Sequence, residues 1–336
     1  MPANLSRRQF IATSAAVAAG TARTLYGAES EKTMRIGIIG LDTSHVIAFT
    51  KIFNNPQAEG NLAQMQVVAG YPGGTDDNPS SYNRVDKFTE QLRSQGIKIF
   101  DTIEDMLPHV DAILLESVDG RPHLEQARPV IAAGKPLFID KPLAGSLRDA
   151  VKIFDLATKA KVPCFSSSSL RFAPGFQAAR DYETSQFGPI KQCVAWGPMS
   201  IEPHHPDLFW YGIHGVETLF TIMGTGCQTV TRPEQTRVVG TWEGGRRGTF
   251  EARKGYGAEV VGEKASGSAG GYGGYEPLVK EIAQFFQTGK PPVSMEETLE
   301  IYAFMEAADE SKRRDGKPVT IAETLEKARE EAAQLR

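Results

Sequence analysis

The sequence predicts an α/β fold: a doubly wound parallel sheet in the N-terminal half, then a C-terminal α+β domain with a mainly antiparallel sheet. Two observations support this prediction. Buried, strand-like runs alternate with helical runs over residues 34–168, which is typical of parallel βαβ units. From residue 227 to residue 253 three strand-like runs follow one another directly, as they do in antiparallel sheets. We therefore expect one domain over residues 33–168 and a second over residues 169–336.

Each element of the first domain has its own signal. The opening strand begins at Arg35 as an apolar run, and the helix after it carries apolar residues at helical spacing up to Phe53. Gly134 ends another predicted helix, because glycine readily adopts the left-handed conformation that closes a helix. Further strands are expected at residues 65–70, 111–117, 135–140 and 162–169, and further helices at residues 84–95, 123–134 and 147–160.

The second domain has shorter, more scattered signals. Gly244 and Gly245 form a tight turn between two strand-like runs, which predicts a hairpin. The segment SGSAGGYGGY, residues 266–275, is so rich in glycine that we expect a flexible covering loop. Strands are expected at residues 190–197, 227–231, 236–243 and 246–253, and helices at residues 275–288, 296–313 and in the charged tail.

Composition excludes several classes of protein. The 336 residues are 40% hydrophobic and 23% charged, as in an ordinary globular protein. A formal net charge of -4 without long basic runs argues against a nucleic-acid-binding protein. Cys164, Cys193 and Cys227 are far apart in the sequence, so we expect buried thiols rather than a disulfide framework or a zinc site.

Residues 1–30 have the pattern of a bacterial export signal. Arg7 and Arg8 precede a short, alanine-rich apolar run, and the start SRRQFI resembles a twin-arginine signal. The apolar run is too short for a stable membrane span. We expect an exported, periplasmic protein, with a basic unstructured N-terminus as the weaker alternative. An enzyme outside the cytoplasm meets no soluble nicotinamide pool, so we expect any such cofactor to be held tightly.

The first strand–turn–helix is where a Rossmann fold binds the pyrophosphate of a dinucleotide, with the fingerprint G-x-G-x-x-G. Gly40 matches the first glycine, but Asp42 and His45 occupy the other two positions. We interpret Asp42 as the N-cap of the following helix, with Thr43 and Ser44 in its first turn. A helix N-terminus with two hydroxyls still suits an anion, which indicates a rebuilt nucleotide site.

Four segments carry a resemblance to a known family. They are HLEQARPVIAAGKPLFIDKPLA, SLRFAPGF, GIHGVE and VSMEETLEIYAFMEAADESKRRDGKPVTI. Together they resemble the glucose–fructose oxidoreductase, inositol dehydrogenase and rhizopine catabolism (Gfo/Idh/MocA) family over about Arg35 to Thr320. The resemblance implies an oxidoreductase that acts on a carbohydrate or polyol with NAD or NADP, and that forms a homo-oligomer.

The resemblance also implies site residues. Lys141, in the triplet Asp140-Lys141-Pro142, and His214 are the expected catalytic pair that handles the proton. Besides His214, the expected substrate residues are Arg171, Trp210 and Tyr211, although Trp210 stands where family members usually carry an aspartate. The second strand lacks the usual ribose-binding acid. The expected cofactor-binding residues are Gly40, Asp42, Thr43, Ser44, Tyr71, Ser117, His123, Asp140 and Lys141.

A different class of function remains open from the residues alone. Five possible metal ligands fall within fourteen residues: His204, His205, Asp207, His214 and Glu217. Such a set is typical of a divalent metal site in a sugar hydrolase, lyase or epimerase. Pro203 and Pro206 make the segment rigid, however, and adjacent histidines tend to diverge, so our primary prediction contains no metal. A carbohydrate-binding homologue without activity is the third alternative.

Overall fold

The computed structural model describes residues 33–180 and 183–335. The predicted export segment, residues 1–30, lies outside these ranges. In the part of the chain that is described, no helix is both long and apolar enough to cross a bilayer.

Six parallel strands form the first sheet, in the order β3-β2-β1-β4-β5-β6. This is the strand order of a doubly wound Rossmann sheet, so the predicted fold class is confirmed. The order reverses between β1 and β4, and ligands bind at the carboxyl ends of strands at such a point. The strands are β1 (Met34–Ile39), β2 (Met65–Tyr71), β3 (Lys98–Ile99), β4 (Ala112–Leu115), β5 (Leu137–Asp140) and β6 (Cys164–Ser167).

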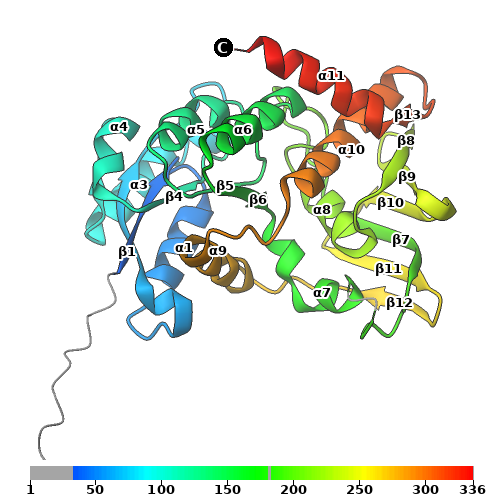
Figure 1. The fold of residues 1–336 in the computed structure, drawn as a ribbon, viewed down its shortest axis with the longest axis horizontal. Coiled ribbons are helices and arrows are strands. Elements are labelled where there is room, and N and C mark those ends of the chain that lie inside the picture. Colours follow the sequence, from blue (N-terminus) through cyan, green and yellow to red (C-terminus); the bar gives the residue numbers. More distant parts are fainter. Residues whose placement is uncertain (1–32, 181–182, 336) are drawn as a thin grey trace, which may run out of the picture. The chain divides into compact units, whose positions relative to one another are not determined.

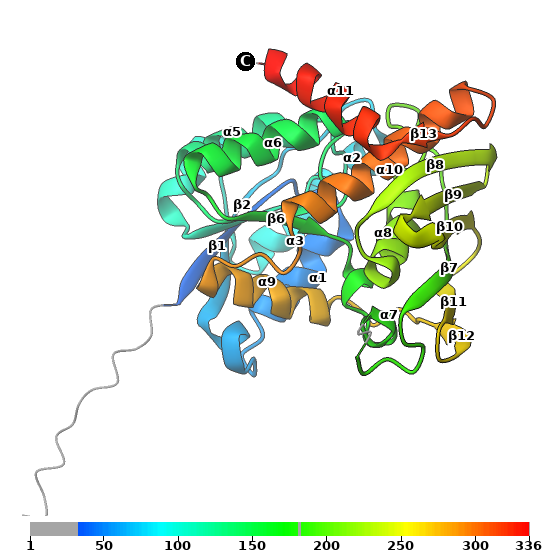
Figure 2. The same cartoon turned by 45° about the vertical axis from the view of Figure 1, so that its right-hand side comes forward.

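Helices cover both faces of this sheet because successive residues of its strands point to opposite sides. Helices α1 and α9 lie on one face of the sheet and α5 and α6 on the other (Figures 1 and 2). Ile36 and Ile38 pack in the cluster that includes residues of α1 and α9, whereas Ile39 packs in the cluster that includes residues of α5 and α6. Helix α9 packs on the first sheet although it comes from the C-terminal part of the chain. The domain boundary expected after residue 168 therefore stays a prediction. The helices are α1 (Ser44–Phe53), α2 (Pro79–Tyr82), α3 (Val85–Ser94), α4 (Ile103–Met106), α5 (His123–Ala132), α6 (Leu147–Ala160) and α9 (Glu276–Thr288).

The second sheet has seven strands in the order β12-β11-β7-β10-β9-β8-β13. Only β10 and β7 pair in parallel, so the sheet is mainly antiparallel as predicted. Two of its helices, α8 and α10, pack against the sheet. The strands are β7 (Ile190–Gly197), β8 (Cys227–Glu234), β9 (Arg237–Trp242), β10 (Arg247–Ala252), β11 (Gly257–Gly262), β12 (Ser266–Ala269) and β13 (Val319–Thr320), and the helices are α7 (Pro174–Arg180), α8 (Gly212–Met223), α10 (Met295–Arg313) and α11 (Ile321–Gln334).

The prediction of a loop over residues 266–275 is partly wrong. Its first four residues form β12, which pairs with β11, a strand that the sequence did not predict. Glycine and serine have weak strand propensity, so composition indicated a loop. Pairing with the edge of an existing sheet supplies the backbone hydrogen bonds that the local sequence does not encode.

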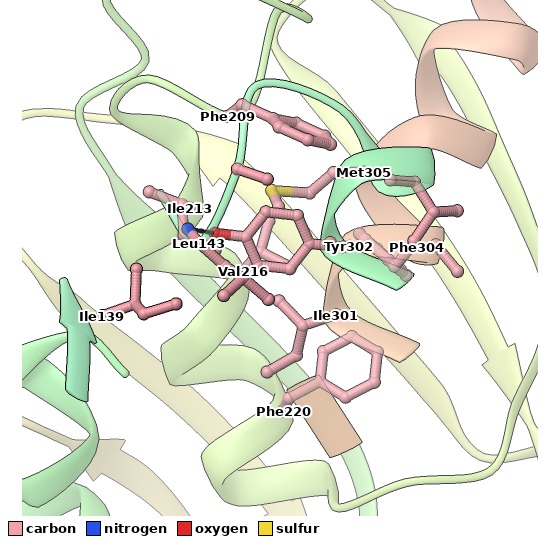
Figure 3. Close-up of a cluster of buried hydrophobic side chains, with 14 of the residues drawn as sticks. Ile139, Leu143, Phe209, Ile213, Val216, Phe220, Ile301, Tyr302, Phe304 and Met305 are labelled. Atoms are coloured by element: carbon pink, nitrogen blue, oxygen red, sulfur yellow. Dashed lines mark hydrogen bonds between the residues drawn. The ribbon is translucent and has the colours of Figure 1, made fainter. Parts of the chain in front are cut away.

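One continuous cluster of buried side chains joins the two sheets (Figure 3). Ile139 of β5 lies in the same cluster as Ile213 of α8 and Ile301 of α10. At its centre the hydroxyl of Tyr302 accepts a hydrogen bond from the backbone N–H of Leu143. This contact attaches the turn that follows β5 to the second sheet's helices, and Lys141 lies in that turn.

Candidate active site

A cavity of about 280 Å³ opens beyond the carboxyl ends of the parallel strands. It lies at the position where a doubly wound sheet binds its ligand. One part of the wall comes from the N-terminus of α1 and the loop near α2, and another comes from α8 and from tyrosines of the second half. The residues that line the cavity include Thr43, Ser44, His45, Ser80, Arg84, Lys141, Trp210, Tyr211, His214, Tyr256, Tyr272 and Tyr275.

The two expected catalytic residues both line this cavity. Lys141 directly follows β5, and His214 lies in the first turn of α8. Nδ1 of His214 lies 2.8 Å from Oγ of Ser168, and this hydrogen bond fixes the orientation of the ring. Burial, and then the positive charges of Lys141 and His45, hold the pKa of His214 well below its usual value. The imidazole is therefore neutral at neutral pH and able to accept a proton.

Aromatic side chains form one side of the cavity. Trp210 and Tyr211, both expected there, line it together with Tyr256, Tyr272 and Tyr275. The ring centroids of Tyr211 and Tyr256 lie 6.0 Å and 5.8 Å from that of His214. Rings with polar edges suit a ligand that has both C–H faces and hydroxyl groups.

Asp42 is not the N-cap of α1, so that interpretation is wrong. The cap is Thr43, whose Oγ1 accepts a hydrogen bond of 3.4 Å from the N–H of His45. The Asp42 side chain is buried, and it accepts hydrogen bonds of 2.6 Å from Ser81 Oγ and 2.8 Å from the N–H of Val118. Burial raises its pKa. The carboxylate thus ties the end of β1 to two distant segments of the chain.

Gly40 is required by a close approach of the chain to itself. It has a φ of 85°, and a Cβ at this position would lie 2.4 Å from Cα of Ser117. Its N–H donates to the carbonyl of Tyr71 at 3.0 Å. The Ser117 hydroxyl donates to Gln126 at 2.8 Å. Gly40, Tyr71 and Ser117, all expected at the cofactor, lie outside the cavity lining and instead hold the strand ends together.

His123 was expected at the cofactor, but the structure buries it completely. Its two ring nitrogens lie 3.1 Å from the carbonyl oxygen of Leu143 and 2.9 Å from that of Ser117. It joins the loops after β4 and β5. Asp140 is also buried and lies 2.7 Å from Nδ1 of His45, which itself lines the cavity. Neither His123 nor Asp140 contributes to the cavity wall directly.

Arg171 does not face the cleft, which corrects the expectation for this substrate residue. Its side chain is 1% exposed and lies between two carboxylates, 2.7 Å from Glu217 and 2.6 Å from Glu297. Glu217 also accepts a hydrogen bond of 2.8 Å from Ser167. The network links η3 (Ser169–Phe172), α8 and α10. Arg171 therefore supports the helix that carries His214.

The five possible metal ligands of residues 204–217 do not converge. His204 and His205 both contact Glu202, and Asp207 lies 2.9 Å from Arg232. Glu217 belongs to the Arg171 network, and His214 faces the cavity. Because each charged group has its own protein partner, this set forms no common coordination sphere.

His205 instead links two loops through charge. Its side chain is fully buried, 2.6 Å from Glu202 and 3.1 Å from Asp119. Burial opposes the positive charge, but the adjacent carboxylates of Asp119 and Glu202 outweigh it and raise the pKa of His205. Contacts with His205 and Arg121 hold the pKa of Asp119 far below its usual range against the effect of burial. The imidazolium therefore stabilises the folded state.

We predict that this stabilisation depends on pH. A raised pKa in the folded state gives a contribution that is complete below the unfolded value of about 6.5 and disappears as pH rises through the folded value. His205→Gln should lower the free energy of unfolding by about 1–3 kcal/mol at pH 6 and by less at pH 9. Urea titrations across this range measure the difference. His204→Gln, at a half-exposed neighbour on the same Glu202, is the control, and a His205→Gln deficit that does not change with pH would contradict the charge assignment.

The sequence did not reveal several residues that lie in the cavity wall or are buried near it. Arg84 is the N-cap residue of α3 and lines the cavity beside Ser80 and Ser44. Glu116 follows β4 and is fully buried near Asp140. Unlike Arg84 and Glu116, His45 could be singled out from the sequence, because it occupies the third glycine position of the dinucleotide-binding fingerprint.

Comparison with known proteins gives an independent result. Residues 75–168 match the model of the GFO_IDH_MocA family, described as an oxidoreductase family with an NAD-binding Rossmann fold. The matched segment runs from the loop after β2 to the end of β6. Among curated relatives, the rhizopine catabolism protein MocA of Rhizobium meliloti is 26% identical over 152 residues, which are 44% of this chain and 41% of the relative. YceM of Salmonella typhimurium is 29% identical over 146 residues, 43% of this chain and 41% of the relative. The alignments thus span about two fifths of the length of these relatives.

Solved structures resemble the fold over most of the chain. Myo-inositol dehydrogenase from Lactobacillus casei, solved in complex with NAD(H) and myo-inositol, has a TM-score of 0.67 at 17% identity, with 86% of this chain and 96% of that chain covered. An oxidoreductase from Thermotoga maritima gives a TM-score of 0.68 at 17% identity, with coverage of 88% and 100%. At this level of identity the likeness shows that the fold is shared.

Proposed function

We propose that this protein is an NAD(P)-dependent oxidoreductase that interconverts a hydroxyl and a carbonyl group on a carbohydrate or polyol. The observation that carries the proposal is the meeting of Lys141 and His214 in one cavity, beside the N-terminus of α1. The family match and the inositol dehydrogenase with NAD(H) among the similar structures support the same reaction class.

The residues at the helix terminus fit the phosphates of a dinucleotide. Thr43 and Ser44 bring hydroxyls to the cavity at the start of a ten-residue helix, whose N-terminus favours negative charge. The Arg84 guanidinium, on the same wall, supplies a cation that pairs well with phosphate. Asp42 turns inward to Ser81 and Val118, so its carboxylate does not oppose the ligand.

Lys141 and His214 divide the proton chemistry between them. The Lys141 ammonium donates a hydrogen bond to the substrate oxygen and favours its negative charge as the proton leaves. With Nδ1–H donating to Ser168, the free Nε2 of His214 accepts that hydroxyl proton. The bound nicotinamide supplies the hydride acceptor, and the carbon that loses hydride becomes the carbonyl carbon. In the reverse direction His214 returns the proton to the new hydroxyl.

The aromatic wall favours a sugar-like substrate. Trp210 and the four tyrosines of the cavity offer ring faces for C–H groups and polar edges for hydroxyls. A charged carboxylate substrate would need a cation besides Lys141 and Arg84, both of which have roles above. A neutral polyhydroxylated ring or chain therefore fits this wall best.

Nucleotide titration tests the proposal. Purified protein should bind NAD+ or NADP+ in calorimetry, and Arg84→Met should weaken this binding about 10- to 100-fold, since hydrogen bonds to charged groups contribute about 1.5–3 kcal/mol. Arg93→Met is the matched control, because Arg93 lies on the same helix and pairs with Glu90 at the exposed surface. Wild-type protein that binds neither nucleotide would refute the proposal.

We further propose that the protein is exported and that it holds its cofactor tightly. The paired arginines Arg7 and Arg8 and the apolar run after them support export. Mass spectrometry of nucleotide released by denaturing native, exported protein should find about one NAD(P) per chain, and light scattering should find a homo-oligomer. Native protein that is recovered from the cytoplasm and carries no nucleotide would contradict both export and tight retention of the cofactor.

A further inference from the structure

Three ligand-bearing side chains meet beside the cavity, where His45 forms part of its wall. His45 comes from the first turn of α1, Glu116 from the residue after β4, and Asp140 from the end of β5. One nitrogen or oxygen from each lies within 4.8 Å of the others. No other such group of three occurs among residues 33–180 and 183–335. His45 lines the cavity, so the group is continuous with the proposed active site.

Glu116 is the unusual member of the group. Its side chain is fully buried, and neither carboxylate oxygen has a hydrogen-bond partner in the described structure. The other buried carboxylates nearby are satisfied: Asp42 by Ser81 and Val118, and Asp140 by His45. A buried carboxylate without a partner is costly unless it binds a proton or a cation.

We propose that His45, Glu116 and Asp140 bind one divalent transition-metal ion beside the cavity wall. One imidazole with two carboxylates is a donor set that suits Zn²⁺ and Mn²⁺. Two ligands on one such ion, each at about 2.0–2.2 Å, lie at most about 4.4 Å apart. Small side-chain rotations bring the three ligand atoms from 4.8 Å to this range.

Charge and ligand number both fit this assignment. The ion's two positive charges balance the two carboxylates, and the ion replaces the missing partner of Glu116. Three protein ligands leave at least one coordination position open, as in catalytic rather than structural metal sites. Because His45 and Lys141 line the same cavity, we expect the open position to face it and to bind a substrate oxygen. The metal would then polarise the same hydroxyl or carbonyl group that Lys141 contacts.

Metal content tests the proposal directly. Purified full-length protein is stripped with a chelator, reloaded separately with Mn²⁺ or Zn²⁺, dialysed and analysed by inductively coupled plasma mass spectrometry. We expect about one ion per chain for one of the two metals, and a higher melting temperature in its presence. Wild-type protein that keeps less than about a tenth of an ion per chain of either metal would overturn the proposal. In that case Glu116 holds a proton instead.

Two variants locate the site. Glu116→Gln keeps the shape of a protonated glutamate side chain but removes its charge. His45→Gln removes the ligand that lines the cavity. Each variant should bind the metal at least tenfold more weakly and should lose the metal-dependent shift in melting temperature. Glu202→Gln is the matched control, because Glu202 is also a buried carboxylate beside histidines, His204 and His205. Unchanged metal binding in both site variants, or its loss in Glu202→Gln alone, would place the ion elsewhere. If Glu116→Gln does not fold, His45→Gln and the wild-type stoichiometry still decide.

This inference goes beyond the oxidoreductase proposal and fails separately from it. Metal stoichiometry is measured without nucleotide, and nucleotide affinity is measured on chelator-stripped protein. Nucleotide binding without metal would refute the metal site alone. A bound metal without any nucleotide affinity would refute the oxidoreductase and favour a metal-assisted lyase, hydrolase or epimerase.

Discussion

Replacing Lys141 with Met, or His214 with Asn, is expected to lower kcat about 10²–10⁴-fold, the usual contribution of a positioned acid–base group. Met removes the ammonium but keeps the length of the side chain. Asn retains a polar group that can bond to Ser168 but cannot accept a proton. Both positions lie in the cavity and contribute little apolar burial, so the fold should persist. Initial rates with a substrate that the wild type oxidises give the comparison.

Matched controls separate this effect from a general loss of charge. Lys135→Met changes a lysine near the amino end of the same strand, β5, where its Nζ donates to the carbonyl of Val110. His109→Asn changes an exposed histidine that stacks near Phe100. Both controls should keep wild-type kcat. Full activity in either Lys141→Met or His214→Asn would end the assignment of that residue to proton transfer.

The pH dependence of the reaction follows from the position of His214. Burial and the adjacent cations lower its pKa, so the neutral, proton-accepting form already predominates at neutral pH. For oxidation of the substrate, kcat should therefore stay constant as the pH is lowered to about 6.5, the usual pKa of histidine. It should decrease only at lower pH.

Local signals in the sequence were sufficient for most of the fold. The helix predicted at residues 147–160 is α6, and the strand predicted at residues 190–197 is β7, because each has a period and bounds that its own residues encode. The weak strands β11 and β12 were missed since their stability comes from pairing with β7 and with each other. Strand pairing between distant segments leaves no mark within a short window.

The candidate site was predictable only where a motif fixes the backbone. Lys141 follows a buried strand and reaches the cavity as expected, whereas Asp42 was misinterpreted because its partners are far away in sequence. Val118 is 76 residues from Asp42, and Ser81 is 39 residues away. A capping aspartate and a buried, inward-facing one have the same local sequence. The unpartnered state of Glu116 is likewise a property of three-dimensional packing.

Arg171 shows how a residue beside the site acts through stability. The sequence placed it in the cleft, but it lies between Glu217 and Glu297 with all three side chains at most 9% exposed. Removing one member of such a network leaves buried charge uncompensated, which commonly costs about 3–5 kcal/mol. A second arginine, Arg180, lies 3.5 Å from Glu297 with a side chain that is 40% exposed. The two arginines therefore form a natural pair for comparison.

Arg171→Met is expected to lower the free energy of unfolding by about 3–5 kcal/mol, whereas Arg180→Met should cost at most about 1 kcal/mol because exposed ion pairs contribute little. Arg171→Lys should be intermediate, since one ammonium cannot reproduce the two-sided contact of a guanidinium. Urea denaturation of the three variants measures these differences. Glu217 lies one turn beyond His214 on α8, so Arg171→Met should also lower kcat by misplacing the imidazole while nucleotide affinity stays near wild type. An Arg171→Met protein as stable as Arg180→Met, with weakened substrate binding, would return Arg171 to the substrate cleft.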